Sequence, residues 1–160
     1  MGMRWKAGRR MTFDHENIIT NIQMKQYAIT RRIGQHITTA LSEIGLTRAQ
    51  FHILNYIGSS DRCRATDIAN MMEVKPSAVT LMIDRLEAHQ WVRRSQDAFD
   101  RRVVVIELTE EGKNILSKAK KISEEVVKHY LSNLSQDDLI RLLEIYEKLE
   151  RIVNDEKRAE

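Results

Sequence analysis

The stretch TDIANMMEVKPSAVTLMIDRLEAHQWVRR, residues 66–94, contains two helical patterns separated by a short turn. The only proline of the chain, Pro76, stands where the second pattern begins, and the fixed φ angle of proline suits the first turn of a helix. The apolar residues that recur at helical spacing after it are Val79, Ile83 and Leu86. We therefore predict a short helix from residue 66 to residue 72, a three-residue turn, and a second helix to about residue 89.

A β-hairpin and a further helix start are predicted directly after this pair of helices. Residues 91–95 and 102–108 have the composition of strands, and the polar loop QDAFDR joins them. The side chains expected on the buried face of the second strand are Val104, Ile106 and Leu108. Residues 109–112, Thr-Glu-Glu-Gly, predict a helix start, because the hydroxyl caps free N–H groups and carboxylates favour the positive end of a helix.

Long amphipathic helices flank this central region. Between residues 14 and 44 the apolar residues recur at steps of three, four or seven, which predicts a helix longer than one small domain needs. Gly45 is placed to end that helix, and Thr47 with Gln50 has the spacing of a capping box for the next one. Two more helices are predicted after residue 109, the last of them beginning at the capping-box sequence SQDD.

The order of these elements predicts a fold that is mainly α-helical with a small β-hairpin wing. The short helix, the turn and the helix that begins at proline form a helix-turn-helix, and the hairpin beside them forms a wing. We divide the chain into a basic flexible arm at residues 1–12, a long helix at 13–45, a winged helix-turn-helix lobe at 46–108 and two C-terminal helices at 109–156.

The charge of the chain is divided unevenly along its length. Residues 1–106 hold 16 lysines and arginines against 10 acidic residues, and residues 107–160 hold 10 against 13. A basic front part indicates a polyanionic partner, although ordinary solvation gives a similar imbalance. The single cysteine excludes an internal disulfide, and the sequence shows neither a signal peptide nor a membrane span, so we expect a cytoplasmic protein.

The second helix of the helix-turn-helix is the expected DNA-reading element. Such a helix enters the major groove with its N-terminus first, and small polar residues near its start let it approach the bases. The residues expected to contact DNA from this helix and from the first strand are Lys75, Ser77, Ala78, Thr80, Leu81, Arg85 and Arg94. Arg93 and Arg94 point to opposite faces of a strand, so we expect at most one of them to reach phosphate.

The tip of the hairpin carries two adjacent cations, Arg101 and Arg102. A narrow minor groove concentrates negative potential, and we expect these arginines to enter it. Asp100 is expected to pair with Arg102 and hold its extended conformation, which reduces the side-chain entropy lost on binding. A solvated turn remains the simpler explanation for either arginine taken alone.

The run Asp100-x-Arg102-x5-Leu108-Thr109 resembles the wing signature of the multiple-antibiotic-resistance regulator (MarR) family. The stretch at residues 66–94 is similar to the helix-turn-helix and first wing strand of that family, and the resemblance extends over roughly residues 14–153. It implies that the outer helices at 13–45 and 109–156 form a homodimer. It further implies a DNA-binding regulator, more often a repressor than an activator, whose small aromatic effector occupies a groove between the dimer helices and the winged lobe.

Three positions depart from the family pattern. Gln90 stands where relatives usually have a helix-ending glycine, so we expect a non-glycine residue in the left-handed conformation at a cost of about 1 kcal/mol. Ala98 replaces a frequent loop proline, which predicts a more mobile wing. Leu81 occupies a position that is often basic, which argues against a strong guanine contact from that point.

Two other classes of function fit the sequence less well than DNA binding. An enzyme needs an oriented nucleophile, a metal cluster or a glycine-rich phosphate loop, and the sequence shows none of these, so we expect no catalysis and no cofactor. A winged-helix module that binds only protein predicts an apolar recognition face and no wing arginines. This sequence keeps the arginines and exposes hydroxyl groups, which favours DNA.

Candidate sensing residues are few. Cys63 suggests a peroxide-sensing regulator, but it lies in the turn before the short helix, and we favour a structural thiol. The five histidines are scattered without metal-ligand spacing, so no metal site is expected. The residues that we expect to line the effector groove are His36, Phe51, His52 and Tyr56, with core or interface packing as their simpler role.

Overall fold

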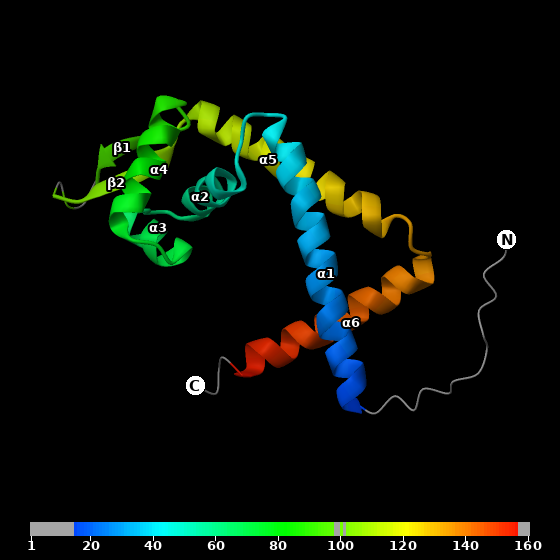
Figure 1. Cartoon of the computed structure of the whole chain (residues 1–160). Helices are drawn as coiled ribbons and strands as arrows, with labels where there is room; N and C mark the ends of the chain where they lie inside the picture. The colour runs from blue at the N-terminus through cyan, green and yellow to red at the C-terminus, as the bar shows by residue number, and fades with distance from the viewer. Residues whose placement is uncertain (1–14, 98–99, 101, 157–160) are drawn as a thin grey trace, which may run out of the picture. The chain divides into compact units, whose positions relative to one another are not determined.

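The computed structural model describes residues 15–97, 100 and 102–156. The elements are α1 (His15–Ser42), α2 (Arg48–Ser59), α3 (Ala65–Met72), α4 (Pro76–Ala88), β1 (Val92–Gln96), β2 (Val104–Leu108), α5 (Glu110–Leu131) and α6 (Gln136–Glu156). This order confirms the predicted fold class of long helices around a helix-turn-helix and hairpin (Figure 1). The chain divides into two units, residues 1–35 and 36–160, and the predicted arm at residues 1–12 lies outside the described residues.

The ends of the helices follow the capping residues that the sequence predicts. Gly45 has a φ angle of +73° and closes α1 in the left-handed conformation. Thr47 accepts a hydrogen bond from the backbone N–H of Gln50 at 3.2 Å, and the Gln50 side chain accepts one from the backbone of Thr47 at 2.8 Å, which completes the capping box. At the start of α6 the Asp138 backbone N–H donates to the Ser135 hydroxyl at 3.2 Å.

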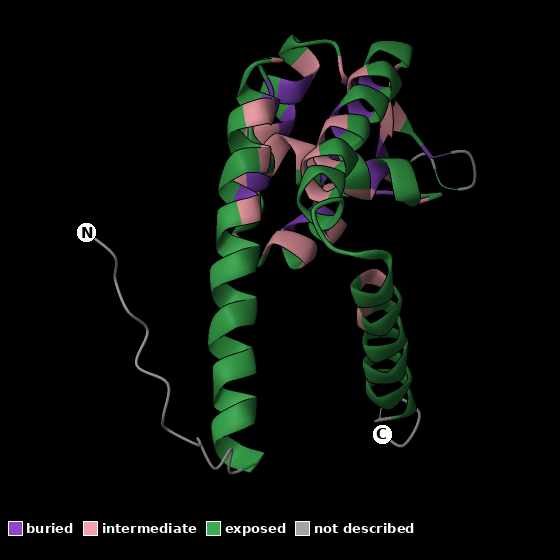
Figure 2. Cartoon of the chain, turned by 90° about the vertical axis from the view of Figure 1, so that its right-hand side faces the viewer, coloured by how far each residue is buried: buried purple, intermediate pink, exposed green. Residues whose placement is uncertain are grey.

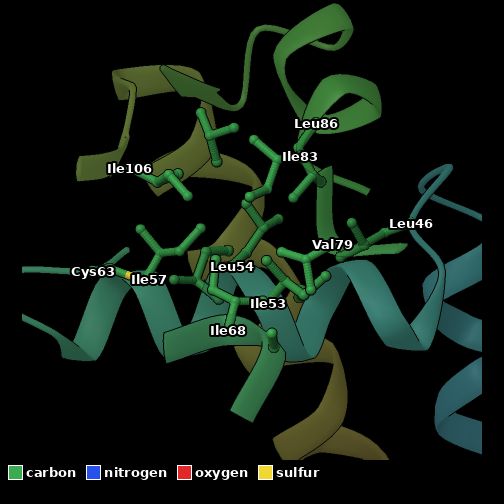
Figure 3. Close-up of a cluster of buried hydrophobic side chains, with 14 of the residues drawn as sticks. Leu46, Ile53, Leu54, Ile57, Cys63, Ile68, Val79, Ile83, Leu86 and Ile106 are labelled. Atoms are coloured by element: carbon green, nitrogen blue, oxygen red, sulfur yellow. The ribbon is translucent and has the colours of Figure 1, made fainter. Parts of the chain in front are cut away.

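One hydrophobic core holds the winged lobe together. The apolar stripes of α2, α3 and α4 meet in it, together with residues from the hairpin and from α5 (Figure 3). Its fully buried side chains include Leu41, Leu46, Ile53, Leu54, Ile68, Val79, Ile83 and Leu86. Burial of each such side chain contributes roughly 1.5–3 kcal/mol to stability, so this core fixes how the helix-turn-helix is presented.

The hairpin pairs β1 with β2 in antiparallel register, with Val92 opposite Leu108 and Gln96 opposite Val104. The predicted buried face of β2 is only partly correct, because Val104 is 51% exposed whereas Val105 and Ile106 are both buried. The other edge of β2 is also covered, since the backbone N–H of Ile106 donates to the carbonyl of Cys63 at 2.8 Å. In a strand that is covered in this way, buried and exposed side chains do not alternate as they do in a strand with one face in water.

Apolar side chains also remain exposed outside this core. In residues 15–35 of α1 the exposed side chains include Ile18, Ile19, Ile22, Tyr27 and Ile29. Nearly all of α6 is exposed as well (Figure 2), including Leu143, Tyr146, Leu149 and Val153. Within the described part of the chain, every helix is too short or too polar to cross a membrane.

Candidate DNA-binding surface

Helix α4 begins at Pro76 after Lys75, whose extended backbone (φ −68°, ψ 144°) makes it the N-cap residue. Val79, Ile83 and Leu86 anchor the helix in the core, and its exposed residues lie on the side away from them. Ser77, Thr80, Leu81 and Arg85 are exposed, and Ala78 is half-buried. The Thr80 hydroxyl donates to the Pro76 carbonyl at 3.2 Å, and the Leu81 side chain is 62% exposed. All five predicted contact residues of α4 therefore lie at or near its surface.

The cations around α4 divide into paired and unpaired side chains. Within residues 15–97, 100 and 102–156, Lys75, Arg85 and Arg102 have no ion-pair partner, so they are available to phosphate. Arg93 instead pairs with Glu107 across the hairpin at 2.9 Å.

The structure places Arg94, one of the cations expected to contact DNA, in ion pairs with residues of α4. Its guanidinium donates to the Asp84 carboxylate at 2.7 Å and also pairs with Glu87, both of which belong to α4. The backbone N–H of Arg94 donates to Glu87 as well, at 3.1 Å. Arg94 therefore joins β1 to the recognition helix, and its charge is already neutralised.

Acidic side chains shape the wing. The Asp100 carboxylate accepts the backbone N–H of Arg102 at 3.0 Å, and no Asp100–Arg102 ion pair occurs among the described residues. The expected role of Asp100 is therefore corrected, because it fixes the backbone of the turn rather than the Arg102 side chain. Arg101 and Ala98 lie outside the described residues.

An ion pair that the sequence did not reveal supports the base of the wing. Asp97 is only 6% exposed and pairs with Arg62 at 2.5 Å. Its carboxylate also accepts the backbone N–H of Asp100 at 2.9 Å, which links the loop before α3 to the hairpin turn. Arg62 and Asp97 both lie in polar turns. Their opposite charges are the only sequence feature that suggests an ion pair, and opposite charges alone do not identify which residues are partners.

A backbone junction connects the end of α4 to the start of α5. Gln90 has a φ angle of +60°, which confirms the expected left-handed residue at this helix end. The Thr109 hydroxyl donates to the Gln90 carbonyl at 2.6 Å and accepts the Gly112 N–H at 2.9 Å. The Thr109 N–H donates to the Trp91 carbonyl at 3.1 Å, so α4 and α5 are held through main-chain groups.

The single thiol is buried inside the lobe. The side chain of Cys63 is 2% exposed, and burial, with a smaller effect from the nearby Asp67 carboxylate, raises the pKa of the thiol from about 9 to about 11. A thiol with so high a pKa is almost entirely protonated at neutral pH and therefore a poor nucleophile. Its environment fits a structural role.

The four residues expected to line an effector groove do not gather in one place. His36 lies in a cavity of about 400 Å³ between α1 and α5, where its ring contacts the Tyr130 hydroxyl. Phe51 and Tyr56 are half-buried against the core, while the exposed His52 accepts a hydrogen bond from Arg48 at 3.4 Å. None of these three lines this cavity, which His36 shares with side chains of α5, so the expected grouping stays a prediction.

Comparison with known proteins identifies the family. The MarR family model matches residues 46–104. The HTH-type transcriptional repressor MdtR of Bacillus subtilis is 31% identical over 144 residues, which cover 89% of this chain and 93% of that protein. The crystal structure of the YusO protein from Bacillus subtilis has a TM-score of 0.71 at 30% identity and covers 86% of this chain and 98% of its own.

A mutant of MepR from S. aureus, solved bound to an oligodeoxyribonucleotide, has the same fold, with a TM-score of 0.63 at 22% identity over 82% of this chain and 97% of its own. Similarity to MdtR and YusO extends over almost the entire length of both relatives. The chain belongs to the MarR family of transcriptional regulators.

Proposed function

We propose that this protein acts as a homodimeric repressor that binds a pseudo-palindromic DNA operator. Each copy places α4 in the major groove, and its wing reaches the adjacent minor groove. Because two recognition helices are related by a two-fold axis, the half-sites lie about one helical turn apart, near 34 Å. The repressor role is inferred from MdtR, which is a transcriptional repressor, and binding to DNA is inferred from the MepR complex with an oligodeoxyribonucleotide.

The distribution of unpaired cations carries the DNA-binding part of this proposal. Lys75 and Arg85 lie at the two ends of α4, and Arg102 lies on the hairpin that packs beside it (Figure 1). The neighbouring arginines Arg93 and Arg94 are neutralised by carboxylates. The surface therefore presents separated positive charges at the recognition helix and wing, which is the pattern required to hold two phosphate backbones across a groove.

Exposed apolar side chains support the homodimer. Ile18, Ile22 and Ile29 on α1 are 39–59% exposed, and Leu143, Tyr146 and Leu149 on α6 are 52–59% exposed. Monomeric proteins rarely leave so many large apolar side chains in water. A second copy of the chain that covers these helices gives both surfaces a partner and brings two α4 helices into one particle.

Titration of the purified protein against DNA from its own upstream region, at several salt concentrations, tests the proposal. We expect saturable binding of one dimer that is at least tenfold tighter than binding to unrelated DNA of equal length. Affinity should fall linearly with salt on logarithmic axes, because bound phosphates release counterions. Sedimentation of the free protein should give a mass of two chains.

A matched pair of arginine variants sharpens this test. Arg102→Ala should weaken specific binding by roughly 1–3 kcal/mol and reduce the salt slope by about one. Arg93→Ala, whose guanidinium is already paired, should leave the slope unchanged. A protein that binds all DNA weakly and equally, or a dimer whose affinity is the same after the Arg102 change, contradicts the proposed mode of reading.

A further inference from the structure

Leu81 is the most exposed large apolar side chain in the described part of the winged lobe. It is 62% exposed, and the other exposed side chain of this kind in the lobe is Val104 on the wing, at 51%. A single exposed leucine is common on protein surfaces, so exposure alone indicates no function. What gives Leu81 a function is its position near the middle of the 13-residue helix α4, the helix that we propose to read DNA.

Leu81 lies on the side of α4 that is turned away from the core. Val79 and Ile83 point into the core from this helix (Figure 3). At roughly 3.6 residues per turn, Leu81 lies about 200° around the helix from Val79. Ser77 and Arg85, four residues before and after Leu81, lie on the same line of the helix. Because the core holds the opposite side, this line meets the base edges when α4 enters the major groove.

Unpaired cations lie before and after Leu81 along the helix. Lys75 is the N-cap residue, and Arg85 lies one turn beyond Leu81. Neither cation has an ion-pair partner among the described residues. Contacts from lysine and arginine to phosphate fix the register of a protein on the duplex without reading its sequence. With Lys75 and Arg85 on the phosphates, the side chain between them is placed at the bases.

The polar side chains beside Leu81 are engaged within the protein. The Thr80 hydroxyl donates to the Pro76 carbonyl at 3.2 Å. The Asp84 carboxylate accepts the Arg94 guanidinium at 2.7 Å, and this pairing neutralises a charge that would repel DNA phosphates. This part of the helix surface therefore offers the bases mainly an apolar group.

The leucine side chain distinguishes base pairs because it can neither donate nor accept a hydrogen bond. In the major groove guanine presents acceptors and cytosine an amino donor, whereas thymine presents a methyl group beside its O4 acceptor. A leucine that covers a G·C edge removes water from polar groups and gives them no partner in return. Against thymine it buries a methyl group, which at roughly 0.8 kcal/mol corresponds to about fourfold in affinity.

We propose that Leu81 contacts the 5-methyl group of a thymine in each half-site, so that the operator requires a T·A pair at the base pair that faces the middle of α4. This contact deepens the proposed DNA-binding function and rests on it. Since a pseudo-palindrome repeats the contact, loss of both thymine methyl groups should weaken binding roughly tenfold or more.

Selection of duplexes from a random library by the full-length protein identifies the operator and tests the position together. We expect the wild-type protein to enrich a pseudo-palindrome with thymine fixed at one position of each half-site. Leu81→Ala should lose the preference at that position and keep it at the others. Val104→Ala is the matched control, because it removes an exposed apolar group from the wing and should keep the thymine.

Uracil in place of the selected thymine deletes the methyl group and keeps every hydrogen bond of the base pair. Uracil in both half-sites should weaken wild-type binding roughly tenfold, whereas Leu81→Ala should bind the thymine and uracil duplexes within about twofold of each other. Arg85→Ala should weaken both duplexes equally and keep the wild-type ratio, because a phosphate contact does not distinguish bases. A C·G pair at this position should bind wild type more tightly when the cytosine carries a 5-methyl group.

The outcomes separate the thymine contact from the regulator function. Specific binding that is equally tight with thymine and uracil, or a Leu81→Ala variant that keeps the wild-type ratio, overturns the contact and leaves the regulator function standing. A wild-type protein that enriches no sequence overturns both. Because Leu81 is exposed, its alanine variant should unfold at the wild-type midpoint, and this measurement separates lost discrimination from a damaged fold.

Discussion

Gly112 on α5 lies against the backbone carbonyl of Trp91, and a Cβ atom at this glycine would overlap the carbonyl oxygen and carbon. The same carbonyl accepts the Thr109 N–H at 3.1 Å, so the first turn of α5 packs against the residue directly before β1. Gly112 is buried within this contact. The recognition helix and α5 are therefore joined where no side chain can be inserted.

The substitution Gly112→Ala should separate this junction, because backbone atoms cannot move aside as the end of a side chain can. We expect a loss of unfolding free energy of about 3 kcal/mol or more, measured by denaturant unfolding. Gly58→Ala is the control, since its Cβ would meet only the ends of Leu116 and Leu108 at 2.9 and 3.0 Å, and should cost about 1 kcal/mol. Equal losses in the two variants would contradict the account of the junction.

Replacement of Gln90 by glycine should stabilise the protein. Gln90 holds a φ angle of +60°, which costs a non-glycine residue about 1 kcal/mol, whereas glycine adopts it freely. The gain is reduced by the greater freedom of glycine in the unfolded chain, so we expect a net increase of roughly 0.5 kcal/mol. Thermal unfolding measures it, with Ala88→Gly inside α4 as the destabilising control. A lower thermal unfolding midpoint for Gln90→Gly than for the wild-type protein would show that the left-handed backbone at Gln90 is not strained.

Arg94→Gln should affect stability rather than DNA affinity. The substitution leaves Asp84 and Glu87 without their cation and loosens β1 from α4, which we expect to cost about 1 kcal/mol because the three groups are partly exposed. The salt slope of DNA binding should stay constant. Arg85→Gln is the matched comparison, since it should lower the slope by about one and leave the unfolding midpoint unchanged. If Arg94→Gln lowered the salt slope and Arg85→Gln lowered the unfolding midpoint, Arg94 would be a DNA contact after all.

The pKa of about 11 for Cys63 predicts a specific dependence of stability on pH. A folded pKa above the unfolded value of about 9 means that the stabilisation is complete below pH 9 and is lost as the pH rises through 11. Wild-type protein should lose roughly 2–3 kcal/mol more than Cys63→Val over this range, measured by denaturant unfolding at each pH. At pH 7 the native thiol should react with iodoacetamide far more slowly than the unfolded one. Rapid alkylation of Cys63 in the native protein would support the alternative that this thiol senses peroxide.

The elements that the sequence predicted correctly depend on local chemistry. Helix starts at Thr47, Pro76 and Thr109 follow from side chains that act within one turn, and the structure confirms each of them. The left-handed backbone at Gln90 was expected from the resemblance to the MarR family, whose members usually have a helix-ending glycine at this position. The order of these elements was enough to predict the winged fold.

The features that the sequence did not predict depend on distant partners. Arg94 has the charge of a phosphate ligand, but its partners Asp84 and Glu87 come from the preceding helix, and only the register of the hairpin places them within reach. The exposure of Val104 also depends on a distant partner. The residues before α3 cover the outer edge of β2 through the hydrogen bond from Ile106 to Cys63, and the burial of β2 therefore departs from simple alternation. Residues on different elements that form one cavity, as His36 and Tyr130 do, have no sequence pattern in common.

The junction at Gly112 couples the direction of α5 to that of the recognition helix α4. At 1.5 Å per residue its 22 residues extend over ~33 Å, and the residues from Ile122 to Tyr130 lie ~15–27 Å along the helix from Gly112. A sideways displacement of ~2 Å at that distance corresponds to a rotation of about 5°. Since the contact at Trp91 is made between backbone atoms, we expect a rotation of α5 about this junction to be passed on to the residues that follow α4.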